Sequence, residues 1–547
     1  MIENQSQDVP VCIGRDNDHY YFRSHSSYKI LKFSASKITK ANLFELAPLQ
    51  FWAESFQTNS KKINAFDLDE ALNWLIQEGK KSSFFSAKNL YGTGFGRDGQ
   101  KLFFNTGESV YFWGPEKLFS ADTNKILKYK YVKNLSDSDS NKTFLEGELV
   151  DIDINQSPAT QDQCQSLFEL IQKLSFENQS SAHLLAGWIF TAQVTGAMAW
   201  RPHIWVTGPA GSGKTTILRD ILIPLIFHKK QFLGKTTEAG IRQTIKADSC
   251  AVFFDEAESF DKISAQRVQN IIELVRASSS DSEAAIIKGS PSGSSIEYYP
   301  RFQACLSSIN TNLATEQDRS RFTLIELVKN PNNDFMTKTK FDFEKMINKD
   351  FANALALRSI DNFRIFTLNF KKLYPLIMKK VSARFADQIG TLAAGYLALI
   401  QDEIVRDPKS FLEAHNYFLP KQKVTLEDSN EMECLGHLLS SSVNDTGTMY
   451  TIQRLLYFVY QNDGQRDFAE KLLETLGLKF NENDDAFLVA TNHAQLAKIF
   501  AGTQWIKWGS SLSRIEGAKY TTTRIYGRVV CAVKIPFACV INRGGDD

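Results

Sequence analysis

The chain has 547 residues, of which 43% are apolar and 23% charged, with 30 glycines, 14 prolines and 7 cysteines. This composition excludes collagen-like, disordered and disulfide-scaffold proteins, and at roughly 100–200 residues per domain it indicates three or four domains. The net charge is only +1, so binding to a nucleic acid would depend on local basic patches rather than on overall charge.

The cysteines and the apolar segments predict a soluble protein of a reducing compartment. The cysteines form no C-x-x-C pair and have no clustered histidines, which argues against a structural zinc site. The first residues are polar, unlike a secretory signal. Residues 184–200 carry no charge, but this run is short and contains polar residues, so we expect a buried helix and no membrane contact.

The first 130 residues have the aromatic-rich pattern of β-strands. Residues 94–113 predict a β-meander, because strand patterns surround a polar turn and Asp98-Gly99 is a tight-turn pair. A helical pattern covers residues 67–78, and the polar segment 136–141 marks a boundary. We expect a β-rich N-terminal domain of unknown role over residues 1–140. Its aromatic residues predict a packed core, since basic residues do not alternate with them.

Three features resemble functional sites but have simpler interpretations. Asp67 and Asp69 form a D-x-D pair like part of a two-metal site, yet Asp67 and Glu70 open a helical pattern and equally form a capping box. The glycine-rich residues 91–96 precede strands, unlike a dinucleotide-binding turn. His183 and His203 lie beside apolar runs, so we expect both to be structural.

From about residue 159 the pattern changes to helices, and residues 204–326 then alternate between strands and helices. This alternation is typical of a parallel sheet covered by helices. Three domains are predicted in this part of the chain. An α/β core covers 157–330, with leading helices at 159–200, and a helical domain covers 335–440. A small α/β domain at 445–547 has a winged-helix-like order of elements. In the last domain we expect helices at 451–460 and 468–476 and strands at 520–526, 529–533 and 537–541.

A phosphate-binding loop begins the α/β core. An apolar strand pattern at 204–207 precedes the sequence G-x-x-x-x-G-K-T, and a helical pattern to Leu225 follows it. Glycines allow backbone N–H groups to surround a β-phosphate at a helix N-terminus, and the lysine reaches the β- and γ-phosphates. The predicted ATP-binding residues are Gly208, Pro209, Ala210, Gly211, Ser212, Gly213, Lys214, Thr215 and Thr216.

A second strand pattern supplies carboxylates for the same site. Residues 250–254 are all apolar, as expected for a strand covered on both faces, and Asp255 and Glu256 follow them. We expect Asp255 and the Thr215 hydroxyl to hold Mg²⁺ and Glu256 to polarise the attacking water. This pair favours ATP hydrolysis over phosphoryl transfer to a small acceptor.

The order of these motifs resembles the AAA+ ATPases, specifically the superfamily 3 helicases of viruses and mobile elements. It is most similar to replication ATPases of phages and prophages, which share runs like TTEAGIRQ (236–243), FDEAE (254–258), DRSRF (318–322) and RFADQIGTL (384–392). The resemblance covers about residues 160–400. It implies a ring, a hexamer or heptamer, that acts on single-stranded or forked DNA in a bacterial host cytoplasm, with a separate primase as a further partner.

The resemblance also implies roles for two further polar positions. Asn310 follows the strand pattern 304–309 and matches sensor 1, which holds the catalytic water or the γ-phosphate. Arg321 matches the arginine finger that enters the neighbouring subunit's site, with Arg319 as the alternative. The two arginines could equally pair with Asp318 or Glu316 on a solvated loop.

A β-hairpin is expected between the Asp255 strand and the Asn310 strand. Residues 284–298 contain two short strand patterns around a Gly/Ser/Pro-rich tip. The matching hairpin of superfamily 3 helicases contacts DNA in the central channel, and Lys288 is the matching lysine. The tip lacks the aromatic or histidine residue expected beside this lysine, so a plain surface turn remains an alternative. Residues 336–386 carry 11 Lys/Arg against 4 Asp/Glu, which indicates either a nucleic-acid contact or a solvated face.

The sequence therefore predicts a multidomain α/β protein with a central P-loop ATPase, a helical region and a small winged-helix-like C-terminal module. We expect an ATP-driven, oligomeric DNA helicase or translocase of phage or mobile-element replication. The alternative is a P-loop ATPase switch in defence or assembly that binds partners or DNA without unwinding. Both interpretations require Lys214, but only the first requires Lys288.

Overall fold

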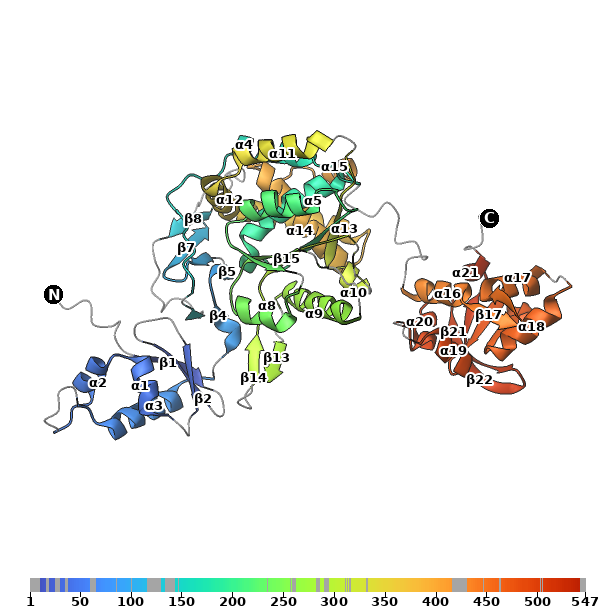
Figure 1. Ribbon diagram of the computed structural model, residues 1–547, viewed down its shortest axis with the longest axis horizontal. Coiled ribbons are helices and arrows are strands. Elements are labelled where there is room, and N and C mark those ends of the chain that lie inside the picture. The colour runs from blue at the N-terminus through green and yellow to red at the C-terminus, as the bar shows by residue number, and fades with distance from the viewer. Residues whose placement is uncertain are drawn as a thin grey trace. The chain divides into compact units, whose positions relative to one another are not determined.

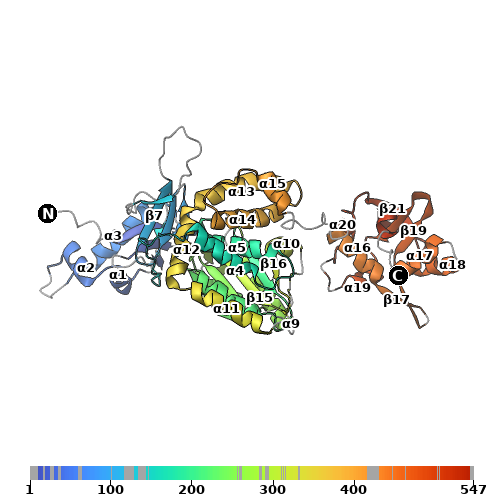
Figure 2. The same ribbon diagram turned by 90° about the horizontal axis from the view of Figure 1, so that it is seen from above.

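The computed structural model divides the chain into two compact units, Met1–Leu419 and Pro420–Asp547, which are described separately (Figures 1 and 2). The residues that it describes are 10–15, 19–24, 30–34, 38–59, 65–84, 86–99, 101–115, 129–132, 143–145, 147–233, 235–255, 257, 262–281, 286–289, 295–309, 311, 313, 316–330, 333–415, 430–445, 447–461, 464–501, 503 and 505–541. The predicted boundary segment 136–141 and the hairpin tip 290–294 lie outside these residues.

The first unit begins with a small sheet and three helices. The antiparallel sheet has the order β1-β2-β3, and the elements are β1 (Val11–Arg15), β2 (His19–Arg23), β3 (Ile30–Ser34), α1 (Lys40–Leu46), α2 (Leu49–Ser55) and α3 (Leu68–Lys81). Trp52 is fully buried between them, and its indole N–H donates to the carbonyl of Leu43 at 2.9 Å. The Asp67 carboxylate accepts from the Glu70 amide at 2.9 Å, so Asp67 is a helix N-cap.

A β-meander follows, as predicted for residues 94–113. The elements of this region are η1 (Ala87–Asn89), β4 (Leu90–Tyr91), β5 (Gly94–Asp98), β6 (Lys101–Asn105), β7 (Val110–Pro115), β8 (Tyr129–Val132) and β9 (Thr143–Phe144). Strands β5 to β8 pair antiparallel in chain order, while β4 pairs with β9. Phe95 and Phe104, 4.4 Å apart between ring centroids, belong to the same hydrophobic core as the central sheet. The meander is therefore continuous with the core, and the separate N-terminal domain expected at 1–140 is not observed as such.

Five parallel strands form the centre of the first unit, which confirms the predicted parallel sheet. Their order is β11-β12-β15-β10-β16, and they span β10 (His203–Thr207), β11 (Lys229–Leu233), β12 (Ala251–Asp255), β15 (Gln303–Ser308) and β16 (Phe322–Glu326). Every residue of β10 and β15 is buried. Such continuous apolar strands form the interior of a sheet that helices cover on both faces.

Two hydrophobic cores cover the two faces of this sheet. Ile204 and Val206 of β10 face a large core with α4 (Gln161–Gln172) and α5 (Ser180–Gln193), whereas Trp205 faces a smaller core with α8 (Glu238–Ile245) and α9 (Lys262–Ser278). This division follows from the alternation of side chains along a strand. Figure 1 shows α8 and α9 on one side of the sheet and α4 and α5 on the other.

The helices after the sheet pack into the large core rather than forming the separate helical domain expected at 335–440. They are α11 (Asn333–Met346), α12 (Lys349–Asp361), α13 (Phe363–Met378), α14 (Ala383–Ile400) and α15 (Pro408–Ala414). Residues of α12, α13 and α14 share one core with α5 and β10 because their apolar faces cover one another. Helix α16 (Asn430–Ser440) belongs instead to the second unit, so the boundary falls near residue 419 and not at 440.

The second unit has its own hydrophobic core and a four-stranded antiparallel sheet of order β19-β20-β22-β21. Besides α16, its elements are β17 (Ser442–Asp445), β18 (Thr448–Thr451), α17 (Ile452–Gln461), α18 (Arg466–Thr475), β19 (Leu478–Asn481), η7 (Glu482–Asp484), β20 (Ala486–Ala490), α19 (Ala494–Ile499), α20 (Trp508–Leu512), β21 (Lys519–Ile525), β22 (Arg528–Pro536) and α21 (Ala538–Ile541). The predicted helices at 451–460 and 468–476 are confirmed. The strand expected at 537–541 is wrong, because this apolar run is a short helix that fills the core with Phe537 and Val540.

The uncharged run at 184–200 belongs to a buried helix and its continuation. All fourteen residues of α5 are buried, and the 3₁₀ turn η3 (Thr195–Ala197) follows. In the part of the chain that is described, no helix has the length and apolar composition needed to cross a bilayer. The backbones of α5 and α14 approach closely at Gly187 and Gly395, where a Cβ on Gly395 would lie 2.7 Å from the Gly187 carbonyl oxygen.

We predict that Gly187→Ala strongly destabilises the first unit. The added Cβ would overlap the Leu392 carbonyl of α14, so one of two buried helices must move. Overpacking of this kind costs about 3 kcal/mol. Urea unfolding followed by tryptophan fluorescence measures the effect. As a control, Gly240→Ala in α8 meets the Thr237 hydroxyl at 3.4 Å and the Thr236 methyl at 3.7 Å, both ordinary contacts, and is expected to be neutral or stabilising by up to about 1 kcal/mol. Equal stability of both variants would contradict the proposed close packing.

Candidate nucleotide and nucleic-acid sites

The five parallel strands end together at one edge of the sheet, which we call the carboxyl edge. The loop of residues 208–213 leaves β10 there and leads into a helix made of α6 (Lys214–Thr216), the π-helical η4 (Ile217–Leu222) and α7 (Ile223–Leu225). Ligands of open α/β sheets bind outside this edge, where helix N-termini and loops converge. The loop between β10 and α6 is therefore placed where a phosphate-binding loop functions.

Glycines are required by the backbone of this loop. The φ angles of Gly208, Gly211 and Gly213 are +150°, +78° and +90°. Residues with a Cβ atom rarely adopt such positive φ angles. A Cβ on Gly208 would lie 2.5 Å from the Leu327 carbonyl oxygen. The loop can thus curl tightly and direct backbone N–H groups toward one point, as an anion-binding cradle requires.

Lys214 and Ser212 have the geometry that suits a bound triphosphate. The Lys214 ammonium donates to the carbonyl oxygens of Gly208, at 2.7 Å, and Pro209, at 3.0 Å, so it lies over the loop. The Ser212 hydroxyl is buried and has no hydrogen-bond partner among the described residues. Thr215 is exposed beside them. These residues fit a nucleotide phosphate chain, since the loop offers a cation and a buried hydroxyl without a partner at the N-terminus of a helix.

Asp255 ends β12 at the same edge, two strands away from β10. Strand β15 lies between β12 and β10, and the Thr207 hydroxyl donates to the Ile309 carbonyl at 2.8 Å, which ties the ends of β10 and β15 together. The Ala257 amide donates to the Ser307 carbonyl at 2.8 Å, so Ala257, two residues after Asp255, still lies beside β15. This places a carboxylate on the carboxyl edge. Glu256 and Asn310 lie outside the described residues.

Arg321 lies at the opposite edge of the sheet from the phosphate-binding loop. It directly precedes β16, whose register pairs Phe322 with His203 and Glu326 with Thr207. Four residues of strand separate these levels, a distance of about 13 Å. The guanidinium of Arg321 cannot reach a phosphate held by its own loop, because an arginine side chain is shorter than this distance.

The surroundings of Arg321 are strongly basic. Its guanidinium is half-buried and donates to the Gln317 carbonyl at 2.9 Å. Burial, and then the nearby cations Arg384 and Arg276, lower its pKa, while Asp318 acts in the other direction. Asp318 is buried and pairs with Arg276 of α9 at 3.2 Å, so it also links helix α10 (Glu316–Arg319) to α9. Arg319 is exposed at the end of α10.

The predicted hairpin is formed by β13 (Ile286–Gly289) and β14 (Ser295–Tyr298), which pair antiparallel. Lys288 is exposed and lies opposite Ile296 in this register. Figure 1 shows the hairpin extending from the body beyond α8 and α9. The Arg242 guanidinium packs 4.4 Å from the centroid of the Tyr298 ring and supports the base of β14.

One residue near the loop carries no motif in the sequence. Lys329 is exposed just after β16, and its Cε lies 3.9 Å from the position of a Cβ on Gly211. It follows a strand that pairs with β10, so the end of that strand leads to the loop. The sequence alone does not show that Lys329 lies near the loop. This becomes apparent only when β16 is known to pair with β10. Within the basic stretch 336–386, three cations form ion pairs: Lys340 with Asp220, Lys349 with Asp151 and Arg358 with Asp402.

His203 is structural, as expected. Its Nδ1 accepts from the Ala304 amide at 3.0 Å, and its Nε2 lies 3.0 Å from the Ser279 hydroxyl. Burial, and then the charge of Arg201, lowers the pKa of His203 to about 3. His183 has its pKa lowered mainly by burial and packs between Phe168 and Tyr396. His203 begins β10, at the edge of the sheet opposite the phosphate-binding loop.

No protein-family model and no curated protein sequence matches the chain. Among solved structures, a chain described as the active helicase Cch of SCCmec type IV aligns over 96% of this chain and 92% of its own, with 14% identity and a TM-score of 0.45. The apo C-terminal region of NrS-1 aligns over 94% of both chains with 12% identity and a TM-score of 0.33. A full-length MCM homologue from Methanopyrus kandleri covers 58% of this chain and 72% of its own, with 10% identity and a TM-score of 0.28. These likenesses are distant, so the function has to be inferred from the residues of the chain itself.

We predict that His203 makes the stability of the first unit depend on pH. Its folded pKa lies below its unfolded value of about 6.5, so the unfolded chain binds a proton that the folded chain excludes. The stabilisation is complete above pH 6.5 and is lost as the pH falls toward 3, by about 1.4 kcal/mol per pH unit.

Urea unfolding between pH 7 and pH 5 tests this expectation. His203→Gln should be less stable at pH 7 but should lose stability more slowly on acidification than the parent. His19→Gln in β2 controls for removing an imidazole elsewhere. The same pH slope in the parent and His203→Gln would show that His203 does not titrate on unfolding.

Proposed function

We propose that the chain is an ATP hydrolase that assembles into a ring and uses hydrolysis to move along or unwind DNA. The observation that carries this proposal is the separation of two groups in one protomer. The phosphate-binding loop and Asp255 share the carboxyl edge, whereas Arg321 begins β16 at the other edge. A complete site for hydrolysis then forms only between two copies of the chain.

Within one protomer, the residues at the carboxyl edge bind and orient the nucleotide. The amides of the loop and the Lys214 ammonium hold the β- and γ-phosphates, and Thr215 with Asp255 would hold Mg²⁺. Bound Mg²⁺ neutralises charge that develops on the phosphates. In this proposal Glu256 orients the attacking water and Asn310 contacts the γ-phosphate. Lys329 lies close enough to the loop to add a further positive charge.

Arg321 supplies the missing positive charge to the neighbouring protomer. Its guanidinium is half-buried, and burial, followed by the nearby cations Arg384 and Arg276, lowers its pKa, with only Asp318 acting against them. It would be stabilised by the charge of a partner's triphosphate. An arginine supplied in trans can accelerate hydrolysis about 10³–10⁵-fold, because it stabilises the charge of the transition state.

We predict that two inactive variants restore activity to each other. Lys214→Ala removes the phosphate lysine and Arg321→Ala removes the arginine, so each protein alone should lose ATPase activity by about 10³-fold or more. In an equal mixture that exchanges subunits, an intact loop meets an intact arginine at about a quarter of interfaces. A phosphate-release assay should therefore recover about a quarter of the parental rate.

The matched control for Arg321→Ala is Arg319→Ala, two residues earlier and exposed, which should retain activity. Failure of the mixture to regain activity, although native mass measurements show mixed oligomers, would contradict a site shared between protomers. Full activity of Arg321→Ala would exclude the arginine from catalysis, and loss of activity in Arg319→Ala alone would assign the role to Arg319.

The hairpin is the proposed contact with DNA. Lys288 is exposed on a ribbon that extends from the body, and an ammonium in that position can contact a backbone phosphate without reading sequence (Figure 1). In a ring, one hairpin per protomer would concentrate positive charge locally, which suits a protein whose net charge is only +1.

We predict that single-stranded DNA stimulates ATP hydrolysis and that Lys288→Ala weakens this stimulation while basal hydrolysis is unchanged. One lost phosphate contact should reduce the salt slope of DNA binding by about 0.7. The control is Lys80→Ala, an exposed lysine at the end of α3. Equal turnover with and without DNA across a range of salt would contradict a motor. Unchanged DNA binding and activity in Lys288→Ala would favour a nucleotide-dependent switch.

The biological setting follows from the motif resemblance alone. On that basis we propose replication of phage or mobile-element DNA in a bacterial cytoplasm, by a hexameric or heptameric ring that works with a separate primase. Native mass measurement with an ATP analogue and a forked DNA would count the protomers.

A further inference from the structure

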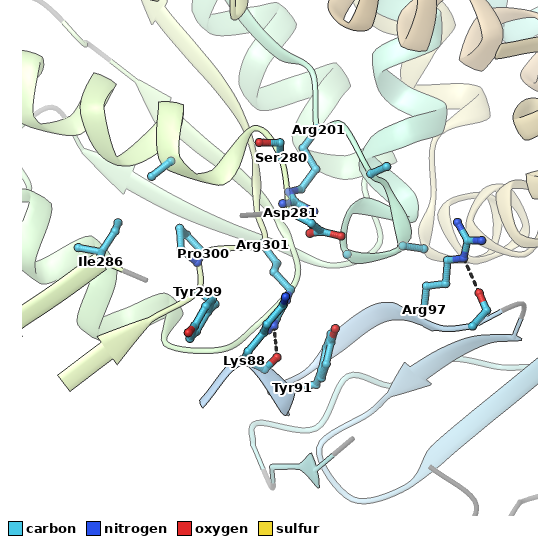
Figure 3. Close-up of a pocket in the computed structure, with 15 residues that line it drawn as sticks. Lys88, Tyr91, Arg97, Arg201, Ser280, Asp281, Ile286, Tyr299, Pro300 and Arg301 are labelled. Atoms are coloured by element: carbon cyan, nitrogen blue, oxygen red, sulfur yellow. Dashed lines mark hydrogen bonds and ion pairs between the residues drawn. The ribbon is translucent and has the colours of Figure 1, made fainter. Parts of the chain in front are cut away.

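A polar cavity of about 620 Å³ lies at the base of the β13–β14 hairpin, which we call the hairpin-root pocket. Three parts of the first unit line it: the strands around residues 88–99, the segment 196–201 before β10, and the two roots of the hairpin at 277–281 with Ile286 and at 299–301. Figure 3 shows Arg301 directed toward Lys88 and Tyr91, with Tyr299 and Pro300 on one side and Arg97 on the other. The pocket faces the edge of the sheet opposite the phosphate-binding loop, because Arg201 and Arg301 precede β10 and β15.

Two buried arginines hold the hairpin roots. Arg201 donates to the Met198 carbonyl at 2.9 Å and pairs with Asp281 at 2.8 Å. Arg301 donates to the carbonyl oxygens of Lys88 and Leu90, and its guanidinium lies 4.0 Å from the centroid of the Tyr91 ring. Burial, and after it the charge of Arg201, lowers the pKa of Arg301, while Asp281 acts in the other direction.

The lining has an excess of positive charge and an apolar wall. Its described cations are Lys88, Arg97, Arg201 and Arg301, against the single carboxylate of Asp281, which already pairs with Arg201. On the hairpin side, Tyr299, Pro300 and Ile286 present a planar ring and two apolar surfaces. An anionic group joined to a flat, partly apolar group matches this combination. A nucleotide has both parts, and the volume lies in the range of small-molecule sites.

We propose that the hairpin-root pocket binds one nucleotide unit of a single DNA strand, with its phosphate at Lys88 and Arg97 and its base against Tyr299. This inference rests on the proposed function, in which the hairpin contacts DNA. The strand is the favoured source of the nucleotide because the wall of the pocket is the root of the hairpin itself. A free nucleoside monophosphate offers the same chemistry and is distinguished by the test below.

Fluorescence anisotropy with an oligothymidylate strand tests the phosphate contacts. The variant Lys88→Ala/Arg97→Ala removes two side chains but keeps the Lys88 carbonyl that Arg301 uses. The matched control is Lys80→Ala/Arg406→Ala, two exposed cations of the same unit that are remote from the pocket lining. We expect the first variant to bind about tenfold more weakly than the control and its salt slope to be lower by about 1.4, while basal ATPase activity is unchanged.

Photo-crosslinking tests the base contact. A strand carrying 5-iododeoxyuridine should crosslink to Tyr299 of the parent protein, as mass spectrometry of the peptides would show. Tyr299→Ala should lose this crosslink and bind DNA about tenfold more weakly, whereas Tyr299→Phe should retain the affinity.

Three results would overturn the inference. If the parent binds DNA and both double variants have the same affinity and salt slope, the pocket does not hold the strand, while the proposed function stands. If thymidine monophosphate binds to the parent but not to Lys88→Ala/Arg97→Ala, and DNA binding is unaffected, the ligand is a free nucleotide. If the parent binds no DNA at any salt concentration, the proposed function fails together with this inference.

Discussion

The parallel register of β10 with its two neighbours is the constraint on which the rest of the structure depends. Because β15 and β16 run in the same direction as β10, the three strands begin at one edge and end at the other. The glycine loop, Asp255 and Lys329 are thereby gathered at the carboxyl edge. Arg321 and both roots of the hairpin are confined to the opposite edge. The phosphate-binding loop and Arg321 of one chain are therefore kept apart by the geometry of the sheet and not by any flexible loop.

The sequence predicted best those features whose physical cause is local. The phosphate-binding loop requires positive φ angles within six residues, so its glycines are visible in the sequence and adopt those angles. The Asp67 cap and the β-meander are local for the same reason. The position of Arg321 relative to the loop is not local, since it depends on β16 pairing with β10 across more than a hundred residues. The sequence could therefore identify Arg321 as a candidate arginine finger. Only the strand order shows that Arg321 cannot reach the phosphate-binding loop of its own chain.

The predicted domain boundaries failed where cores are shared. The meander and the helices α12 to α14 were separated from the central sheet by breaks in sequence pattern, yet Phe104, Leu355 and Leu392 fill one core with β10. A polar or proline-rich connection ends an element without ending a domain. Conversely, α16 follows the helical block in sequence but buries Leu435 and Leu438 in the second unit. The apolar run at 537–541 could be a strand or a helix, because five apolar residues are too few to show a period.

Arg201 and Arg301 carried no recognisable signal because Asp281, the partner of Arg201, and the carbonyl oxygens that Arg301 binds lie far away in the sequence. Arg301 joins the end of the hairpin to the N-terminal strands, and two residues later β15 begins. β15 is buried on both faces and bonded on both sides, so it cannot slide alone, and its far end meets the phosphate-binding loop through Thr207 and Ile309. A displacement of β15 at the phosphate-binding loop would therefore also displace Arg301 relative to the N-terminal strands. The contact of Arg301 with Lys88 and Leu90 is the point at which such movement must be resisted or released.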